Sequence, residues 1–135
     1  MTQISNDVAV KEIERWLDAK KVSKAKRQSS EDSISALVAA VEDGKLLISD
    51  DGTILTQVLE FEIGSDNPVK QLAYKLRLTV DEIHKRMIGS QVKATDLHGT
   101  LRVYVCALTD QHYVAVGKMD TADYSLATTI AGFFM

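Results

Sequence analysis

The sequence predicts an α+β fold with two N-terminal helices, a small antiparallel β-meander and a C-terminal helical half. Apolar residues recur at helical spacing near both ends of the chain, but they alternate with polar residues in its middle. The helical period returns after Thr79. With 135 residues and 45% hydrophobic content, the chain can bury a useful core. We expect an N-terminal helical segment with a basic linker over residues 1–45, and a small α+β domain over residues 46–135.

Two helices are expected before the meander. The first spans residues 8–21 and places four apolar side chains near one face: Val8, Ile13, Trp16 and Leu17. The polar and basic stretch 23–30 has no periodicity, which indicates a linker or a frayed helix end. The second helix begins near Ser30 and ends at Gly44, and its apolar positions are Ile34, Leu37, Val38 and Val41.

The meander is predicted from alternation and turn residues. Residues 46–48 and 54–63 form a hairpin around Asp51-Gly52, a pair that tolerates positive φ in a tight turn. In the second strand Leu59, Phe61 and Ile63 alternate with Glu60 and Glu62, so one face is expected to be solvated. Residues 69–76 alternate again and predict a third strand.

The C-terminal half of the chain is predicted to be helical. Thr79 and Glu82 form a capping box for a helix that ends at Gly89. A second helix starts at Thr95 or Asp96, and its expected apolar stripe is Leu97, Leu101, Tyr104, Val105 and Leu108. A short turn at 112–118 precedes a last helix that is capped by Asp120 and runs to Phe133, with Asp123 in its first turn.

The residues that carry chemistry predict no catalytic, metal or cofactor site, and hence no enzyme. His84, His98 and His112 have no ligand set around them and are expected to be solvated. The single Cys106 lies in an apolar run, which is typical of a small buried hydrophobe in a reducing compartment. The seven glycines are scattered singly, so no phosphate-binding loop is expected. The sequence therefore favours a protein that works by binding another protein.

The charge distribution and the hydropathy of the chain limit the classes of partner that the sequence predicts. The net charge of −3 divides into +3 over residues 1–30, −8 over 31–66 and +2 over 67–135, which suits docking within the chain or a charged partner.

The basic run 20–27 is the one nucleic-acid-like feature, but it lacks aromatics and the pI is about 5.6, so nucleic acid is an unlikely partner. With no secretory signal and no apolar run that spans a bilayer, a cytoplasmic protein without membrane contact is expected.

Several short fragments of the C-terminal half occur in a recognisable order. They are the strand 69–77 leading into Leu78-Thr79-Val80-Asp81-Glu82-Ile83, then Ala107-Leu108-Thr109-Asp110, Lys118-Met119-Asp120, Asp123-Tyr124 and Ile130-Ala131-Gly132-Phe133-Phe134. This order resembles the tail assembly chaperones of contractile-tailed phages. The resemblance covers about residues 54–135, and departures from the family pattern are Leu78 for Pro, Asp110 for Gly and Met119 for Leu.

The resemblance implies a helper that is absent from the finished virion and acts in the host cytoplasm if the gene belongs to a phage or prophage. Such proteins bind the tape measure protein, and possible contact with the tail-tube protein is also implied. A wide apolar face on the last helix offers candidate partner-binding residues: Leu126, Ile130, Phe133 and Phe134. The same face could instead complete the core. The alternative function is a structural virion component, such as a tail or head–tail connector subunit.

Overall fold

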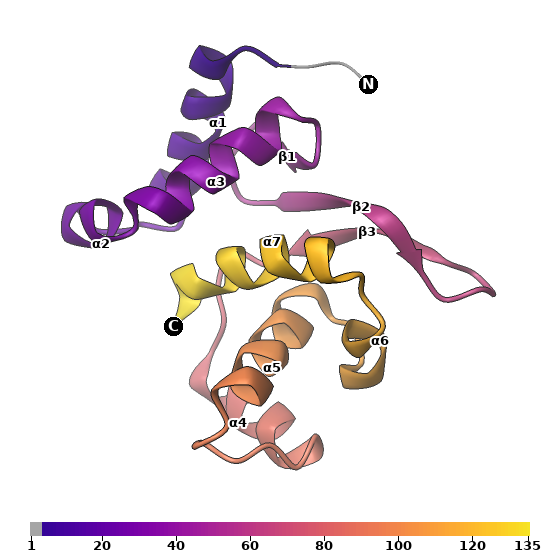
Figure 1. The fold of residues 1–135 in the computed structure, drawn as a ribbon. Coiled ribbons are helices and arrows are strands. Elements are labelled where there is room, and N and C mark those ends of the chain that lie inside the picture. The colour runs from indigo at the N-terminus through magenta and orange to yellow at the C-terminus, as the bar shows by residue number, and fades with distance from the viewer. Residues whose placement is uncertain (1–3) are drawn as a thin grey trace. The chain divides into compact units, whose positions relative to one another are not determined.

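The computed structural model describes residues 4–135 and confirms the predicted fold class, an α+β fold with helices at both ends (Figure 1). The chain divides into two compact units, residues 1–59 with 71–76, and residues 60–70 with 77–135. The expected domain boundary after residue 45 stays a prediction. The three strands form one sheet in the order β1-β2-β3.

The first unit contains three helices and the base of the sheet. Its helices and first strand are α1 (Asn6–Ala19), α2 (Lys24–Ser29), α3 (Glu31–Glu42) and β1 (Leu46–Ile48). The strands β2 (Leu55–Ile63) and β3 (Val69–Tyr74) begin and end, respectively, in this unit. β1 pairs antiparallel with β2, with Leu46 opposite Gln57 and Ile48 opposite Leu55. α1 packs on α3, and both contact β1.

Two details of the N-terminal helices differ from expectation. Val8 is 48% exposed, and Ala9 takes its place in a buried stripe with Ile13, Trp16 and Leu17. The stretch expected as a linker or frayed end forms the short helix α2, because the Ser23 side chain accepts a hydrogen bond from the Lys26 amide.

The tight turn between β1 and β2 lies against α1. Gly52 adopts φ +77°, and a Cβ atom there would lie 2.7 Å from the backbone oxygen of Arg15. The Arg15 side chain donates from Nε to the Ser49 carbonyl at 3.3 Å. Glycine is therefore required at position 52 both for its backbone angle and for close approach to the helix.

The buried base of the sheet contains one polar pair. Tyr74 on β3 donates its hydroxyl proton to Oε1 of Gln57 on β2, and the two oxygen atoms are 2.5 Å apart. Both side chains are almost fully buried. The bond satisfies polar atoms that would otherwise lose their hydration without compensation.

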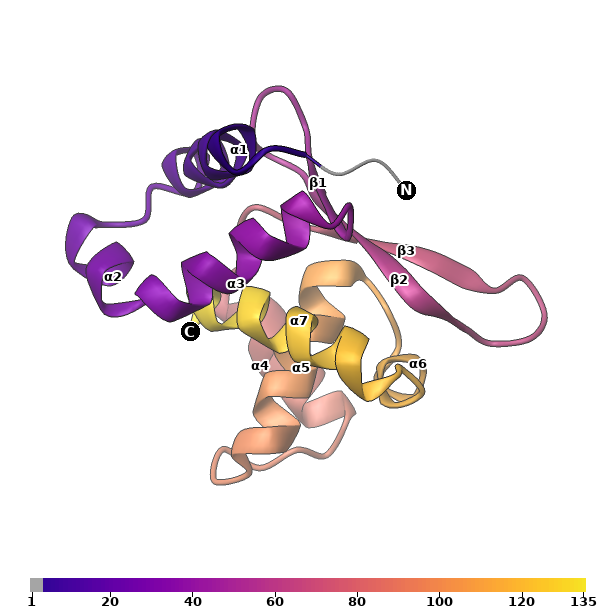
Figure 2. The ribbon, with the colours of Figure 1, turned by 45° about the horizontal axis from the view of Figure 1, so that its top comes forward.

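The second unit is helical apart from the far end of the hairpin. Its helices are α4 (Val80–Gly89), α5 (Leu97–Thr109), α6 (Tyr113–Gly117), α7 (Thr121–Ala131) and a terminal 3₁₀ turn η1 (Gly132–Phe134). α5 is the central helix, and it packs on α4, α6 and α7 (Figures 1 and 2). The core contains Val103 and Leu108 of α5, Val116 of α6, and Ala127 and Ile130 of α7.

The predicted caps of these helices are confirmed. Thr79 accepts from the Glu82 amide, Asp96 from the Gly99 amide, and Asp120 from the Ala122 amide. The expected stripe of α5 is wrong at Leu97, which is 74% exposed. This residue follows the N-cap directly and lies outside the buried stretch Val105–Thr109.

The expected alternation of β2 fails at Phe61, which is 61% exposed, next to the exposed residues Glu60 and Glu62. The backbone amides of Glu60 and Phe61 both donate to the carboxylate of Asp123. Two successive backbone amides of β2 thus bond to one carboxylate on α7, and Phe61 lies in the exposed stretch between the buried residues Leu59 and Ile63.

Candidate functional site

The four residues predicted to bind a partner lie on α7 and in η1, and their exposures differ. Ile130 is fully buried and Phe133 is 7% exposed, whereas Leu126 and Phe134 are half-buried. Ile130 is therefore part of the core, which agrees with the alternative interpretation that the apolar face of the last helix completes the core. Whether the four residues bind a partner stays a prediction.

Phe134 lines an apolar groove of about 300 Å³. Its walls come from the segment before α4, from α4 itself and from α5, and include Leu78, Val80, Ile83, Met87 and Tyr104. Two sequence fragments that lie about fifty residues apart, Leu78–Ile83 and Ile130–Phe134, thus contribute to the same groove. Sequence reasoning placed only the second of them among the candidate site residues.

The helix that forms one wall of this groove is unusually exposed. α4 is amphipathic, yet none of its ten residues is buried. Val80 and Ile88 are 85% and 64% exposed, and Ile83 and Met87 are half-buried. An amphipathic helix ordinarily covers its apolar face, so α4 presents a candidate contact surface. Arg77, which directly precedes the groove residue Leu78, is exposed.

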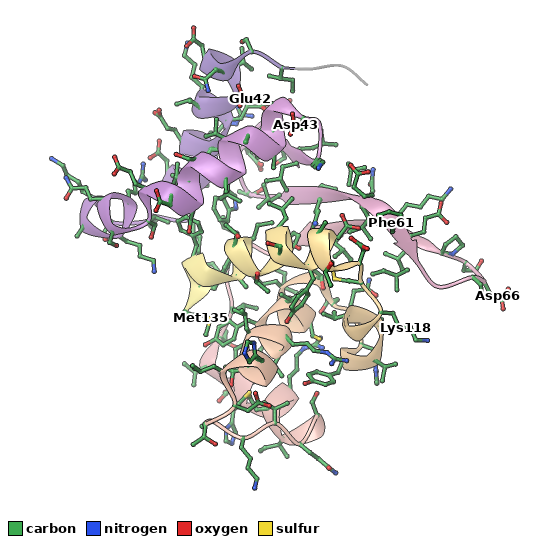
Figure 3. The ribbon with its side chains drawn as sticks, viewed as in Figure 1. Glu42, Asp43, Phe61, Asp66, Lys118 and Met135 are labelled. Atoms are coloured by element: carbon green, nitrogen blue, oxygen red, sulfur yellow. The ribbon has the colours of Figure 1, made fainter. Side chains whose placement is uncertain are left out.

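The first turn of α7 has a clear structural role. Asp123 is 4% exposed, and its two carboxylate oxygens accept from the Glu60 amide at 3.0 Å and the Phe61 amide at 3.1 Å. Figure 3 marks Phe61 and Lys118, which lie on the hairpin and just after α6. Asp123 was predicted as a first-turn acid of the last helix, which is correct. No local sequence pattern predicted that the Asp123 carboxylate would bond to the backbone of β2.

The hairpin beyond this attachment is largely exposed, apart from the buried Ile63. Its loop carries Asp66 at the far end (Figure 3), and Lys70 and Glu62 form an exposed ion pair across the two strands at 3.9 Å. Exposed ion pairs of this kind contribute less than about 1 kcal/mol. Charged side chains on exposed strands generally disfavour pairing with other strands.

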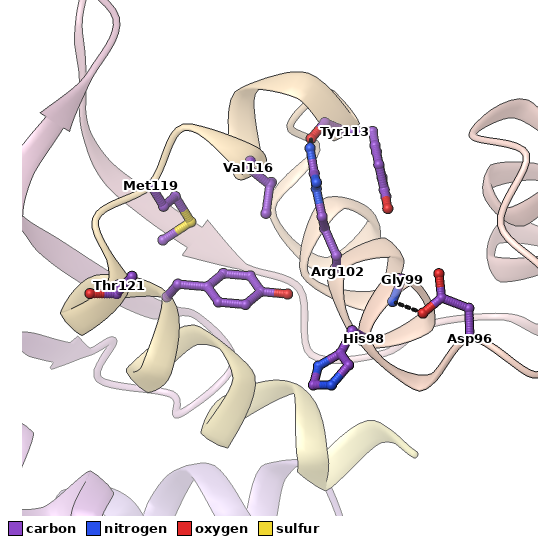
Figure 4. Close-up of a pocket in the computed structure, with 10 residues that line it drawn as sticks. Asp96, His98, Gly99, Arg102, Tyr113, Val116, Met119 and Thr121 are labelled. Atoms are coloured by element: carbon purple, nitrogen blue, oxygen red, sulfur yellow. Dashed lines mark hydrogen bonds between the residues drawn. The ribbon is translucent and has the colours of Figure 1, made fainter.

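A second concave site lies between α5, α6 and the start of α7 (Figure 4). It is a cavity of about 390 Å³, and the residues used below are Asp96, Gly99, Arg102, Tyr113, Gly117 and Tyr124. The Arg102 guanidinium carbon lies 3.8 Å from the centroid of the Tyr113 ring. Sequence reasoning missed this site. Its one available signal was an arginine between the apolar residues Leu101 and Val103.

Burial shifts the pKa values of two groups in this unit, the Tyr124 hydroxyl and the Cys106 thiol. Burial raises the pKa of the Tyr124 hydroxyl, against a smaller opposing effect of the Arg102 charge. Burial likewise raises the pKa of the Cys106 thiol, and the charges of Arg86 and Arg102 oppose it. Both groups therefore stay protonated at neutral pH. The prediction that Cys106 is buried is confirmed.

The three histidines are exposed, as predicted. His84 borders the apolar groove and His98 borders the cavity, while His112 caps α6 through Nδ1, which accepts from the Val114 amide at 3.3 Å. Over residues 4–135, no group of three or more His, Cys, Asp or Glu side chains is placed to hold a metal ion. In the same part of the chain, no helix combines the length and apolar character needed to cross a membrane.

Comparison of the chain with protein-family models, with curated protein sequences and with solved structures finds no match.

Proposed function

We propose that this protein is a phage tail assembly chaperone, which binds the tape measure protein during tail assembly without catalysing a reaction. The proposal rests on the ordered fragments between Val69 and Phe134 that resemble this family. One structural observation supports it: Leu78–Ile83 and Phe134, which belong to two of those fragments, line one apolar groove.

The proposed binding surface is this groove together with the exposed side of α4. A tape measure protein is largely helical, and an amphipathic helix needs its apolar face covered until the tail tube surrounds it. A groove with Val80, Ile83, Met87 and Phe134 on its walls suits helix-in-groove binding. Arg77, next to the groove residue Leu78 in the chain, favours an acidic residue beside the apolar stripe of the bound helix.

Co-expression with the tape measure protein of the same genome tests the function. We expect a stable complex and more soluble tape measure protein than in its absence. If no complex forms and solubility does not increase, the proposed function is wrong. The gene offers a second readout, because a slippery run before the stop codon with an overlapping downstream frame is typical of the family.

A matched pair of variants tests the surface separately. Val80→Gln removes an apolar side chain from the groove, and Val114→Gln makes the same change at a 55% exposed position on α6. Burial of a valine contributes about 1.5 kcal/mol or more, so Val80→Gln should weaken tape measure binding about tenfold. The Val114 variant should bind normally. Equal binding by both variants would place the contact elsewhere and leave the proposed function standing.

Mass spectrometry of purified particles distinguishes the proposed chaperone from the alternative, a structural virion component. A chaperone should be missing from them, whereas a connector or tail subunit should be present in stoichiometric amounts. The possible contact with the tail-tube protein can be tested in the same co-expression system.

A further inference from the structure

The cavity between α5, α6 and α7 contains an arginine whose orientation is set by its surroundings. Arg102 donates from Nε and Nη2 to the carbonyl oxygen of Tyr113, at 3.1 and 2.6 Å. The Tyr113 ring covers one face of the guanidinium, and Figure 4 shows the two side chains lying alongside each other. A guanidinium held in this way is preorganised for a further partner, because little side-chain entropy remains to be lost.

The charge of Arg102 is not neutralised by an acidic side chain. Other arginines of the chain have such partners: Arg27 pairs with Asp18 at 2.8 Å and Arg86 with Asp110 at 3.4 Å. Among the described residues, no carboxylate lies within ion-pair distance of Arg102. Asp96, the one acid that lines the cavity, uses Oδ1 to accept from the Gly99 amide at 2.9 Å. With Nε and one N–H of Nη2 bonded to Tyr113, Nη1 and the second N–H of Nη2 remain as donors.

Glycine at position 117 makes the arrangement possible. A Cβ atom there would overlap Nη2 of Arg102, so any larger residue would displace the guanidinium. The φ angle of Gly117 is not in the left-handed region, so only the space requires glycine. The rest of the lining combines the apolar side chains Val116 and Met119 and the Tyr124 ring with the polar side chains His98 and Thr121.

We propose that this cavity binds a single carboxylate group attached to an apolar or aromatic body. The end of a guanidinium matches the two oxygens of a carboxylate, and the apolar part of the lining, formed by Val116, Met119 and the Tyr124 ring, matches the body. One arginine beside Asp96 suits a monoanion, whereas a phosphate dianion would meet stronger repulsion from that carboxylate. A volume of about 390 Å³ accommodates a ligand the size of one amino-acid residue with its terminal carboxylate. The site is independent of the apolar groove and of the proposed chaperone function.

The carboxylate can belong to a free organic acid or to the C-terminus of a polypeptide. Three probes separate these sources: 3-phenylpropionate, N-acetylphenylalanine and N-acetylphenylalanine amide. Each is titrated into the ¹⁵N-labelled full chain at constant ionic strength, and the signals followed are the Gly99 and Gly117 amides and the Arg102 Nε–H. Both acids should cause saturable shifts and the amide should not. Tighter binding of N-acetylphenylalanine assigns the site to a polypeptide terminus, and the reverse order assigns it to a free acid.

Variants decide whether Arg102 is the binding group. Arg102→Gln should weaken binding about tenfold or more, since it removes the charge-assisted hydrogen bonds. Gly117→Ala leaves the arginine in the chain but displaces its guanidinium, and should weaken binding to a similar extent. If Arg102→Gln does not fold, the Gly117→Ala variant still tests whether the guanidinium binds the ligand. Lys85→Gln removes an equal charge from exposed α4 and should bind normally. Non-saturable shifts, equal shifts with the amide, or unchanged binding by Gly117→Ala would overturn the proposal.

Discussion

The attachment of β2 by Asp123 gives the sharpest prediction about stability. Asp123→Asn keeps the shape of the side chain but replaces one acceptor oxygen with an NH₂ group, which faces a backbone amide of Glu60 or Phe61. A hydrogen bond to a charged group contributes about 1.5–3 kcal/mol, and the remaining bond loses its charge assistance. Both bonds are only partly buried, so water can replace part of the loss. We expect the free energy of unfolding to fall by about 1.5–3 kcal/mol.

Urea denaturation measures this loss, and hydrogen exchange locates it. The amides of Glu60 and Phe61 should exchange about tenfold faster or more in the variant, because each loses part or all of its acceptor. Asp120→Asn is the matched control, since Asn and Asp are comparable N-caps and its cost should stay below about 1 kcal/mol. If Asp123→Asn costs no more than Asp120→Asn, or if both amides keep their protection, the attachment does not stabilise the hairpin.

Three further predictions concern titratable groups. Burial lowers the pKa of Lys20 from 10.5 to about 8, so the folded state holds fewer protons than the unfolded state between these values. Stability should therefore rise with pH in this window, and Lys20→Met should abolish the rise in urea titrations at pH 7.5–10.5. Hydrogen bonds from Ser49 and Thr53 lower the pKa of Asp51 from 3.8 to about 2. Its stabilising effect should be complete above pH 3.8 and lost as the pH falls to about 2, and Asp51→Asn should lack this acid dependence in thermal melts. The buried Cys106 thiol, with its raised pKa, should react with iodoacetamide at pH 8 far more slowly in native than in urea-unfolded protein, and equal rates would contradict its burial.

Local sequence signals predicted the elements well, because caps and turns depend on residues close together in the chain. Thr79, Asp96 and Asp120 cap their helices as expected. Gly44 and Gly52 adopt the positive φ angles that their turns need. The same signals were less reliable for burial, since Val8 and Leu97 satisfy a helical period and are nevertheless exposed.

The concave sites were the least predictable features. Phe134 was chosen because it belongs to an apolar stripe, but its neighbours in the groove come from α4 and α5. The cavity around Arg102 depends on Tyr113 and Gly117, which lie 11 and 15 positions further along the chain. Helical periodicity describes one element at a time, and a site built by three elements has no period.

By itself, the sequence determined the order of strands and of every helix except α2, the caps of α4, α5 and α7, and the burial of Cys106. These follow from φ/ψ preferences and from hydrogen bonds between residues a few positions apart. Only the tertiary structure decided the second role of Asp123. A first-turn acid on α7 accepts hydrogen bonds from two amides on β2 that lie more than sixty residues earlier in the chain. Such a bond forms after the chain has brought distant segments together, so no local pattern encodes it.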